Sequence, residues 1–254
     1  MNRVDLNADA GEAFGHWRVA DEAALFPHLT SVNLACGFHA GDPLTMTEAL
    51  KLAKMCKVAV GAHPGFPDRV GFGRRDLAAS PAEIEADVVY QLGALGAFLN
   101  RAELPMHHVK AHGALYLQMM VTETTALAVT DAVAAFGAHL PLVILAGEGG
   151  ELMRRVAVAG GLSVVAEAFP DRAYLANGQL APRRAEGAVL SDAAHIAERA
   201  VALATGGALP ALDGGEVTVS AETLCLHGDH PGAAATAAAV RRALEEAGIE
   251  LAAF

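Results

Sequence analysis

The chain has 254 residues, which at about 150 residues per domain suggests one or two domains, although single α/β barrels commonly reach this length. Its 53% hydrophobic and 19% charged residues, with a mean hydropathy of +0.33, exclude an intrinsically disordered protein and can form one large core. The formal net charge of -11 opposes binding to nucleic acid or to an anionic membrane surface.

Short apolar runs alternate with longer helical patterns along the whole chain, which is typical of repeated β/α units and a parallel sheet. Asp42 begins a predicted helix that ends at residue 57, and Ser80 with Glu83 forms a capping box before a helix to about residue 101. Ser191 begins a helix through about residue 205, and a last helix ends near residue 248. Strands are predicted around residues 3–8, 30–35, 58–62, 107–112, 141–146, 162–167 and 222–227.

This alternation predicts an α/β protein with a single (β/α) barrel of about seven parallel strands over residues 1–254. No Pro/Ser-rich linker or low-complexity tract divides the chain. The segments 168–190 and 206–215 depart from the β/α rhythm and are predicted as excursions from it. The alternative is an open, doubly wound sheet, which would bind its ligand where the strand order reverses.

The three cysteines are Cys36, Cys56 and Cys225. Their odd number and the lack of C-x-x-C spacing argue against a disulfide framework or a structural zinc site. The sequence also has no signal-peptide pattern and no apolar run of about 18 residues that could span a membrane. We therefore expect a cytoplasmic protein with no membrane partner and no nucleic-acid partner.

Polar and ionisable residues gather at the carboxyl ends of the predicted strands and in the loops that follow. Side chains of a strand alternate between its two faces, so Asp5, Asn7 and Asp9 share one face. Parallel barrels carry their active sites at this end of the strands, and unpaired polar groups in an inert core would cost about 1–3 kcal/mol each. We therefore expect a catalytic pocket there. The other polar residues expected at this pocket are Glu12, Asn33, His39, His63, Asp68, Lys110, His112, Glu167, His227 and Asp229.

Several familiar motifs are absent from the sequence. It contains no G-x-x-x-x-G-K-[ST], G-x-G-x-x-G or G-x-S-x-G, and so lacks the usual loops for ATP, dinucleotides and serine-hydrolase chemistry. His39, His63, His112 and His227 with one carboxylate would make an acceptable set of ligands for a divalent metal. His108 and His112 have the H-x-x-x-H separation, but on a strand they would lie about 13 Å apart. The sequence therefore leaves a metal undecided.

Long and specific motifs run along the whole chain. They are 5–9 (DLNAD) with Gly11 and Glu12, 33–42 (NLACGFHAGD), 61–69 (GAHPGFPDR), 72–74 (FGR), 109–116 (VKAHGALY), 167–172 (EAFPDR), Pro182 and Arg183 with Gly187 and Ala188, and 225–229 (CLHGD). In this order they resemble the LamB/YcsF family. Two departures are visible, because Ala111 stands where the family usually has Pro, and Leu117 stands where an Asn often follows Tyr116.

The resemblance implies a barrel related to the glycoside hydrolase/deacetylase superfamily. It also implies cleavage of 5-oxo-L-proline to L-glutamate coupled to ATP hydrolysis, in a complex with two partner subunits, B and C. ATP would be a co-substrate, and with no recognisable nucleotide loop in this chain the partners could bind most of it. On this basis the isolated chain is not expected to hydrolyse 5-oxoproline at a useful rate.

A lactam is a resonance-stabilised amide that resists attack, so phosphorylation of its oxygen gives ATP a chemical role. Water could then attack the ring carbon while a second group protonates the ring nitrogen. Lys110 is expected to neutralise negative charge and His112 to exchange a proton. The expected catalytic residues are Asp9, Glu12, His39, His63, Lys110, His112 and Glu167. The expected substrate-binding residues are Asp5, Asn7, Asn33, Asp68, Arg74, Asp171, Arg172, His227 and Asp229.

Two alternatives from other classes remain. One is a metal-dependent deacetylase or amidohydrolase that acts without ATP. The other is a non-catalytic subunit that only holds the partner subunits together. Metal content would distinguish the first, and substitutions in the pocket that leave the activity of the complex intact would distinguish the second.

Overall fold

The computed structural model describes residues 3–228 and 232–254, and its centre is a set of parallel strands. Adjacent strands follow the order β3-β2-β1-β8-β5-β4, and every pair along this path is parallel. The short β9 (Glu250–Leu251) also pairs with β1. The central strands are β1 (Arg3–Ala10), β2 (Ser31–Ala35), β3 (Ala59–His63), β4 (Leu142–Leu145), β5 (Val164–Ala168) and β8 (Thr223–Leu226).

The segment 107–112 closes this path into a ring. Val109 forms parallel bridges with Ala62 of β3 on one side and with Leu142 of β4 on the other. The backbone N–H of Lys110 also donates to the carbonyl of Ala62 at 2.9 Å. The predicted barrel of about seven parallel strands is therefore confirmed, and the open doubly wound alternative is wrong. The predicted strand at 107–112 is reduced to one bridging residue.

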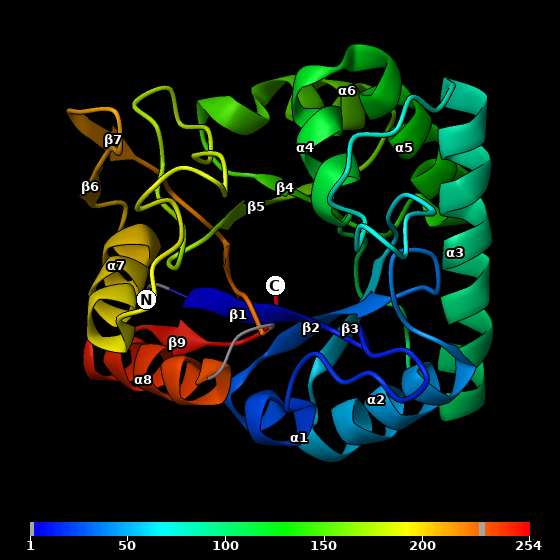
Figure 1. Cartoon of the computed structure of the whole chain (residues 1–254), viewed down its shortest axis with the longest axis horizontal. Coiled ribbons are helices and arrows are strands. Elements are labelled where there is room, and N and C mark those ends of the chain that lie inside the picture. The colour runs from blue at the N-terminus through cyan, green and yellow to red at the C-terminus, as the bar shows by residue number, and fades with distance from the viewer. Residues whose placement is uncertain (1–2, 229–231) are drawn as a thin grey trace.

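Helices surround the strands on the outside (Figure 1). The apolar residues on the outer faces of the strands, such as Leu6 and Ala8 of β1, are 0% exposed. The helices are α1 (Glu22–Leu25), α2 (Pro43–Cys56), α3 (Pro81–Ala102), α4 (Gly113–Val121), α5 (Glu123–Gly137), α6 (Glu151–Ala159), α7 (Ala193–Thr205) and α8 (Ala233–Glu246), with short 3-10 turns at Phe26–His28 and Glu148–Gly150.

The helix start signals were mostly predicted correctly. Ser80 and Glu83 form the capping box of α3, and Asp42 is the N-cap of α2. The predicted start of α7 at Ser191 is wrong by one residue, because the side chain of Asp192 accepts a hydrogen bond from the backbone N–H of His195 at 2.7 Å. A carboxylate at that position caps the helix, so the preceding serine lies outside it.

The two predicted excursions differ from each other. Residues 168–190 are largely irregular, with isolated bridges at Arg172 and Tyr174. The segment after α7 instead forms an antiparallel hairpin of β6 (Ala208–Pro210) and β7 (Glu216–Thr218), which the sequence pattern missed. Each of these strands has only three residues, too few for an alternating pattern to be visible.

Within residues 3–228 and 232–254, no single helix is both long and apolar enough to cross a membrane. The adjacent α4 and α5 pass the test of length and composition only when taken together, and they are bent by 116°.

Asp42 gives the fold a testable dependence on pH. Its carboxylate accepts from the backbone N–H of Gly15 at 2.9 Å and from those of Leu44 and Thr45 at 2.9 and 3.1 Å, and these bonds lower its pKa to about 2. Asp42→Ala should reduce the free energy of unfolding by about 1 kcal/mol. Because the folded pKa is depressed, this contribution is complete above about pH 4 and is lost as the pH falls towards 2.

Urea unfolding between pH 3 and pH 7 measures this difference. The matched control is Asp76→Ala, which removes an exposed aspartate from a loop. Equal losses in both variants, or a loss in Asp42→Ala that does not change with pH, would contradict the capping role.

Candidate active site

The interior of the barrel is polar at both ends of β1. At the amino end, Asp5 accepts hydrogen bonds from the hydroxyls of Thr30 at 2.6 Å, Ser31 at 2.8 Å and Thr223 at 2.5 Å. Burial raises the pKa of Asp5, although these three hydroxyls oppose the shift. Asp5 is therefore surrounded by hydroxyl groups at the start of the strand and is 1% exposed. This position does not favour the substrate-binding role expected for it.

The next polar layer contains two predicted amides. Asn7 donates to Glu167 Oε1 at 3.1 Å, and Asn33 donates to Asn7 Oδ1 at 2.7 Å. His108 Nε2 lies 2.8 Å from Asn33 Oδ1. A Cβ on Gly61 would lie 2.1 Å from this ring nitrogen, so only glycine leaves room for the His108 ring. This layer supports the charged groups that follow.

Lys110 lies between two carboxylates. Its Nζ is 2.8 Å from Glu167 Oε1 and 3.3 Å from Asp9 Oδ1, and it donates to Cys225 Sγ at 3.0 Å. The side chains of Lys110 and Glu167 are 3% and 0% exposed, whereas that of Asp9 is 16% exposed. Asp9 is therefore the member of this charged group that solvent or a ligand can reach.

The side chains of this charged group, Lys110, Asp9 and Glu167, shift one another's pKa values. Burial alone would raise the pKa of Asp9, but His63 and Lys110 outweigh it and hold this pKa well below its usual range. Burial would lower the pKa of Lys110, yet Asp9 and Glu167 keep it well above its usual value. Burial dominates at Glu167, whose pKa is raised. Two neighbouring carboxyl groups with oppositely shifted pKa values are typical of acid–base sites.

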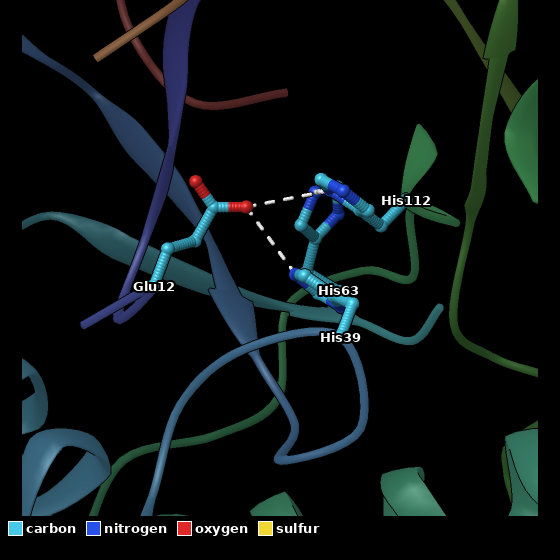
Figure 2. A group of neighbouring side chains, drawn as sticks. All are labelled: Glu12, His39, His63 and His112. Carbon is cyan, nitrogen blue, oxygen red and sulfur yellow. Dashed lines mark hydrogen bonds and ion pairs between the residues drawn. The ribbon is translucent and has the colours of Figure 1, made fainter. Parts of the chain in front are cut away.

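A second group, which we call the histidine cluster, comprises Glu12, His39, His63 and His112. Figure 2 shows the Glu12 carboxylate facing the three imidazole rings. Glu12 Oε1 lies 3.2 Å from His39 Nε2 and 3.3 Å from His112 Nδ1. One ligand atom from each residue lies within 4.8 Å of the others, so this cluster could hold a metal ion.

Burial keeps part of the histidine cluster uncharged. It lowers the pKa of His39 well below its usual value, and His112 and His63 add to the shift. Burial and the neighbouring His63 lower the pKa of His112 to about 3. The rings of His39 and His112 stack with their centroids 3.7 Å apart. Neutral imidazoles are the form that binds metals.

His227 lies beside the charged group but outside the histidine cluster. Its Nδ1 is 2.7 Å from Asp171 Oδ2, and its backbone N–H donates to the same oxygen at 3.0 Å. Its ring stacks on Phe169 at 5.8 Å between centroids, and Phe169 lies 5.3 Å from Lys110 Nζ. Of the four histidines expected to form a metal set, His227 is the one that the structure places elsewhere. Arg183 contacts its Nε2.

The remaining predicted residues that the structure describes lie in different surroundings outside the charged group and the histidine cluster. Arg172 donates to the carbonyls of Ala181 at 2.6 Å and Ala188 at 3.2 Å, which holds the irregular segment together. Asp68 accepts from the backbone N–H of Gly71 at 2.9 Å and pairs with Arg75 in its own loop. The guanidinium of Arg74 lies 4.9 Å from the centre of the Phe72 ring. Asp229 lies outside the described residues.

Several neighbours of the site were not predicted as site residues. Among them are Cys225, which accepts from Lys110, His108, which contacts Asn33, and Phe72, whose ring lies 5.3 Å from that of His112. Strand alternation could have identified Cys225 and His108, because each shares a face with predicted residues. No sequence signal identifies Phe72.

Comparison with known proteins extends over almost the whole chain. The family model described as LamB/YcsF family matches residues 4–254. A Thermus thermophilus protein, named as the A subunit of 5-oxoprolinase, is 57% identical over 252 residues, which cover 99% of this chain and 100% of the relative. A Deinococcus radiodurans protein of the same name is 50% identical over 249 residues, which cover 98% of this chain and 96% of the relative.

One solved structure agrees closely with the fold. It is the crystal structure of a lactam utilization protein, also from Thermus thermophilus, with 54% sequence identity and a TM-score of 0.93. The alignment covers 99% of this chain and 100% of that chain. The likeness therefore includes the complete barrel.

The buried charged group predicts a large effect of one substitution on stability. Lys110→Met should lower the free energy of unfolding by about 3–5 kcal/mol, because it leaves Asp9 and Glu167 without their cation. Adding Glu167→Gln should restore part of this loss by removing one of the two uncompensated charges. Chemical denaturation of the single and double variants measures both effects.

The matched control is Lys54→Met, which breaks an exposed ion pair with Glu103 and should cost less than about 1 kcal/mol. If Lys110→Met were no more destabilising than this control, the ion pairs of Lys110 would not stabilise the barrel.

Proposed function

The chain belongs to the LamB/YcsF family, and we propose that it is the A subunit of an ATP-dependent 5-oxoprolinase, which opens the lactam ring of 5-oxo-L-proline to give L-glutamate. The observation that carries this proposal is the 57% identity to a relative named as the A subunit of 5-oxoprolinase, because that match covers 99% of the chain. The polar interior of the barrel supplies groups suited to the reaction.

Ring opening needs activation, since amide resonance makes the lactam carbon a poor electrophile. Transfer of the γ-phosphoryl group of ATP to the lactam oxygen releases ADP and activates this carbon. Water then adds to the carbon, and the C–N bond breaks as the ring nitrogen takes a proton. The resulting acyl phosphate is hydrolysed by a second water to L-glutamate and inorganic phosphate.

Asp9 is the group that we assign to proton transfer. Its side chain is 16% exposed, and its carboxylate is held ionised by the neighbouring His63 and Lys110. It accepts a proton from the attacking water and returns this proton to the departing nitrogen. Lys110 acts as a positioning residue, because its side chain is 3% exposed and reaches the ligand only through Asp9.

A group of three arginines, Arg74, Arg172 and Arg183, favours an anionic ligand. Burial lowers the pKa of Arg172 to about 10, and the like charges of Arg183 and Arg74 add to this shift. Like charges gathered near one another favour the binding of an anion. We assign Arg183 and Arg74, with His227, to the carboxylate of 5-oxoproline or to the transferred phosphoryl group.

Two partner subunits, B and C, complete the proposed enzyme. This chain carries none of the familiar phosphate-binding motifs in its sequence. We therefore assign most of the contacts with ATP to the partners, while this subunit binds the lactam. The barrel then acts on an intermediate that the partners help to form.

The activity prediction separates this function from its alternatives. The complete complex should release glutamate from 5-oxoproline only when ATP is present, whereas the isolated chain should release none above background, because an unactivated lactam is inert. Within the complex, Asp9→Asn should lower turnover by about 10²–10⁴-fold, the usual contribution of positioned proton transfer. A coupled assay for glutamate measures both results.

Asp21→Asn is the matched control, since Asp21 caps the short helix α1 through its side chain and lies outside the barrel interior. ATP-independent cleavage by the isolated chain would instead indicate a metal-dependent amidohydrolase. Full activity of the complex that contains Asp9→Asn would instead indicate a non-catalytic subunit that only holds the partner subunits together.

A further inference from the structure

Backbone carbonyls fix the protonation of two rings in the histidine cluster. His63 Nδ1 lies 2.8 Å from the carbonyl oxygen of Lys110, and His112 Nε2 lies 2.8 Å from that of Phe72. A carbonyl oxygen can only accept a hydrogen bond. Each of these nitrogens therefore carries a proton, and in the neutral rings the lone pairs belong to His63 Nε2 and His112 Nδ1.

These two lone pairs face each other and two carboxylates. His63 Nε2 is 2.9 Å from His112 Nδ1 and 3.2 Å from Asp9 Oδ2. His112 Nδ1 is 3.3 Å from Glu12 Oε1. With both rings neutral, four acceptor atoms meet without a hydrogen between them, in a site where each of the histidines is at most 3% exposed. A positive charge shared by these atoms, either a proton or a metal ion, removes the repulsion between their lone pairs.

We propose that the histidine cluster binds one divalent transition-metal ion of the zinc type through Glu12, His39, His63 and His112. Three imidazoles and one carboxylate are a suitable set for such an ion. A tetrahedral site with bonds of about 2.0 Å holds its ligand atoms about 3.3 Å apart. The distances of 2.9, 3.2 and 3.3 Å between neighbouring ligand atoms of the cluster are close to this value.

The surroundings of the cluster match those of metal-binding histidines. Ligating histidines usually donate their second ring N–H to a carbonyl or carboxylate, which fixes the ring. His63 and His112 do so, to Lys110 and Phe72. Among the described residues the Nδ1 of the buried His39 has no hydrogen-bond partner, so no such bond prevents this ring from turning towards the ion.

Metal binding is tested without turnover, so its failure would not affect the proposed 5-oxoprolinase activity. The untagged full-length chain is treated with a chelator, dialysed, and titrated with Zn²⁺ and with Co²⁺. We expect one bound ion per chain by elemental analysis after desalting, a visible absorption band from four-coordinate Co²⁺, and a higher unfolding temperature with Zn²⁺.

Glu12→Gln and His39→Gln should each weaken Co²⁺ binding by at least about a hundredfold. Loss of a residue that only supports a metal ligand typically weakens metal affinity by about 10- to 100-fold, and loss of a ligand itself should cost at least the upper value. His227→Gln is the matched control, because this histidine pairs with the buried Asp171 but lies outside the cluster. His195→Gln is an exposed control. Circular dichroism establishes that each variant is folded.

The site is supported if both control variants bind one ion with unchanged affinity while the two cluster variants lose this binding. The proposal is overturned if the wild-type chain binds no Co²⁺ or Zn²⁺ above background, or if the His227→Gln control loses as much affinity as Glu12→Gln.

Discussion

The need to keep Lys110 charged inside the barrel determines much of this structure. An ammonium group that is 3% exposed is costly unless carboxylates lie against it, and Asp9 and Glu167 supply them from β1 and β5. These strands lie on opposite sides of β8, while Lys110 comes from the segment that closes the ring. The charged group therefore forms only when the barrel is closed, which couples the site to the fold.

His63 connects the two parts of the site, the charged group and the histidine cluster. Its Nε2 lies 3.2 Å from Asp9, and its Nδ1 bonds the carbonyl of Lys110, so one ring contacts both the charged group and the histidine cluster. Strands supply Asp9 and Glu167 to the charged group, and Lys110 follows the bridging residue Val109, whereas the loop residues Glu12 and His39 complete the cluster. The strands thus position the two buried carboxylates, and the loops after them add Glu12 and His39 at the carboxyl end of the barrel.

Much of this arrangement follows from the sequence because strand alternation is a local property. It correctly places Asn7, Asp9, Lys110 and Glu167 on the interior of one barrel. It cannot distinguish the two ends of a strand, which is why Asp5 was expected to bind substrate although it is held by hydroxyls at the amino end. The position of His227 beside Asp171 depends on the irregular segment 168–190, for which no periodic pattern exists.

The most direct test of this account is the charge of Lys110. The chain has only four lysines, and Lys51, Lys54 and Lys57 are exposed on or just after α2. In protein labelled with ¹³Cε and ¹⁵Nζ lysine, NMR spectra from pH 7 to about pH 10.5 report each side chain separately. The account predicts that Lys110 stays an ammonium group throughout this range, because Asp9 and Glu167 hold its pKa well above the usual value. A neutral Lys110 at pH 9 would contradict it.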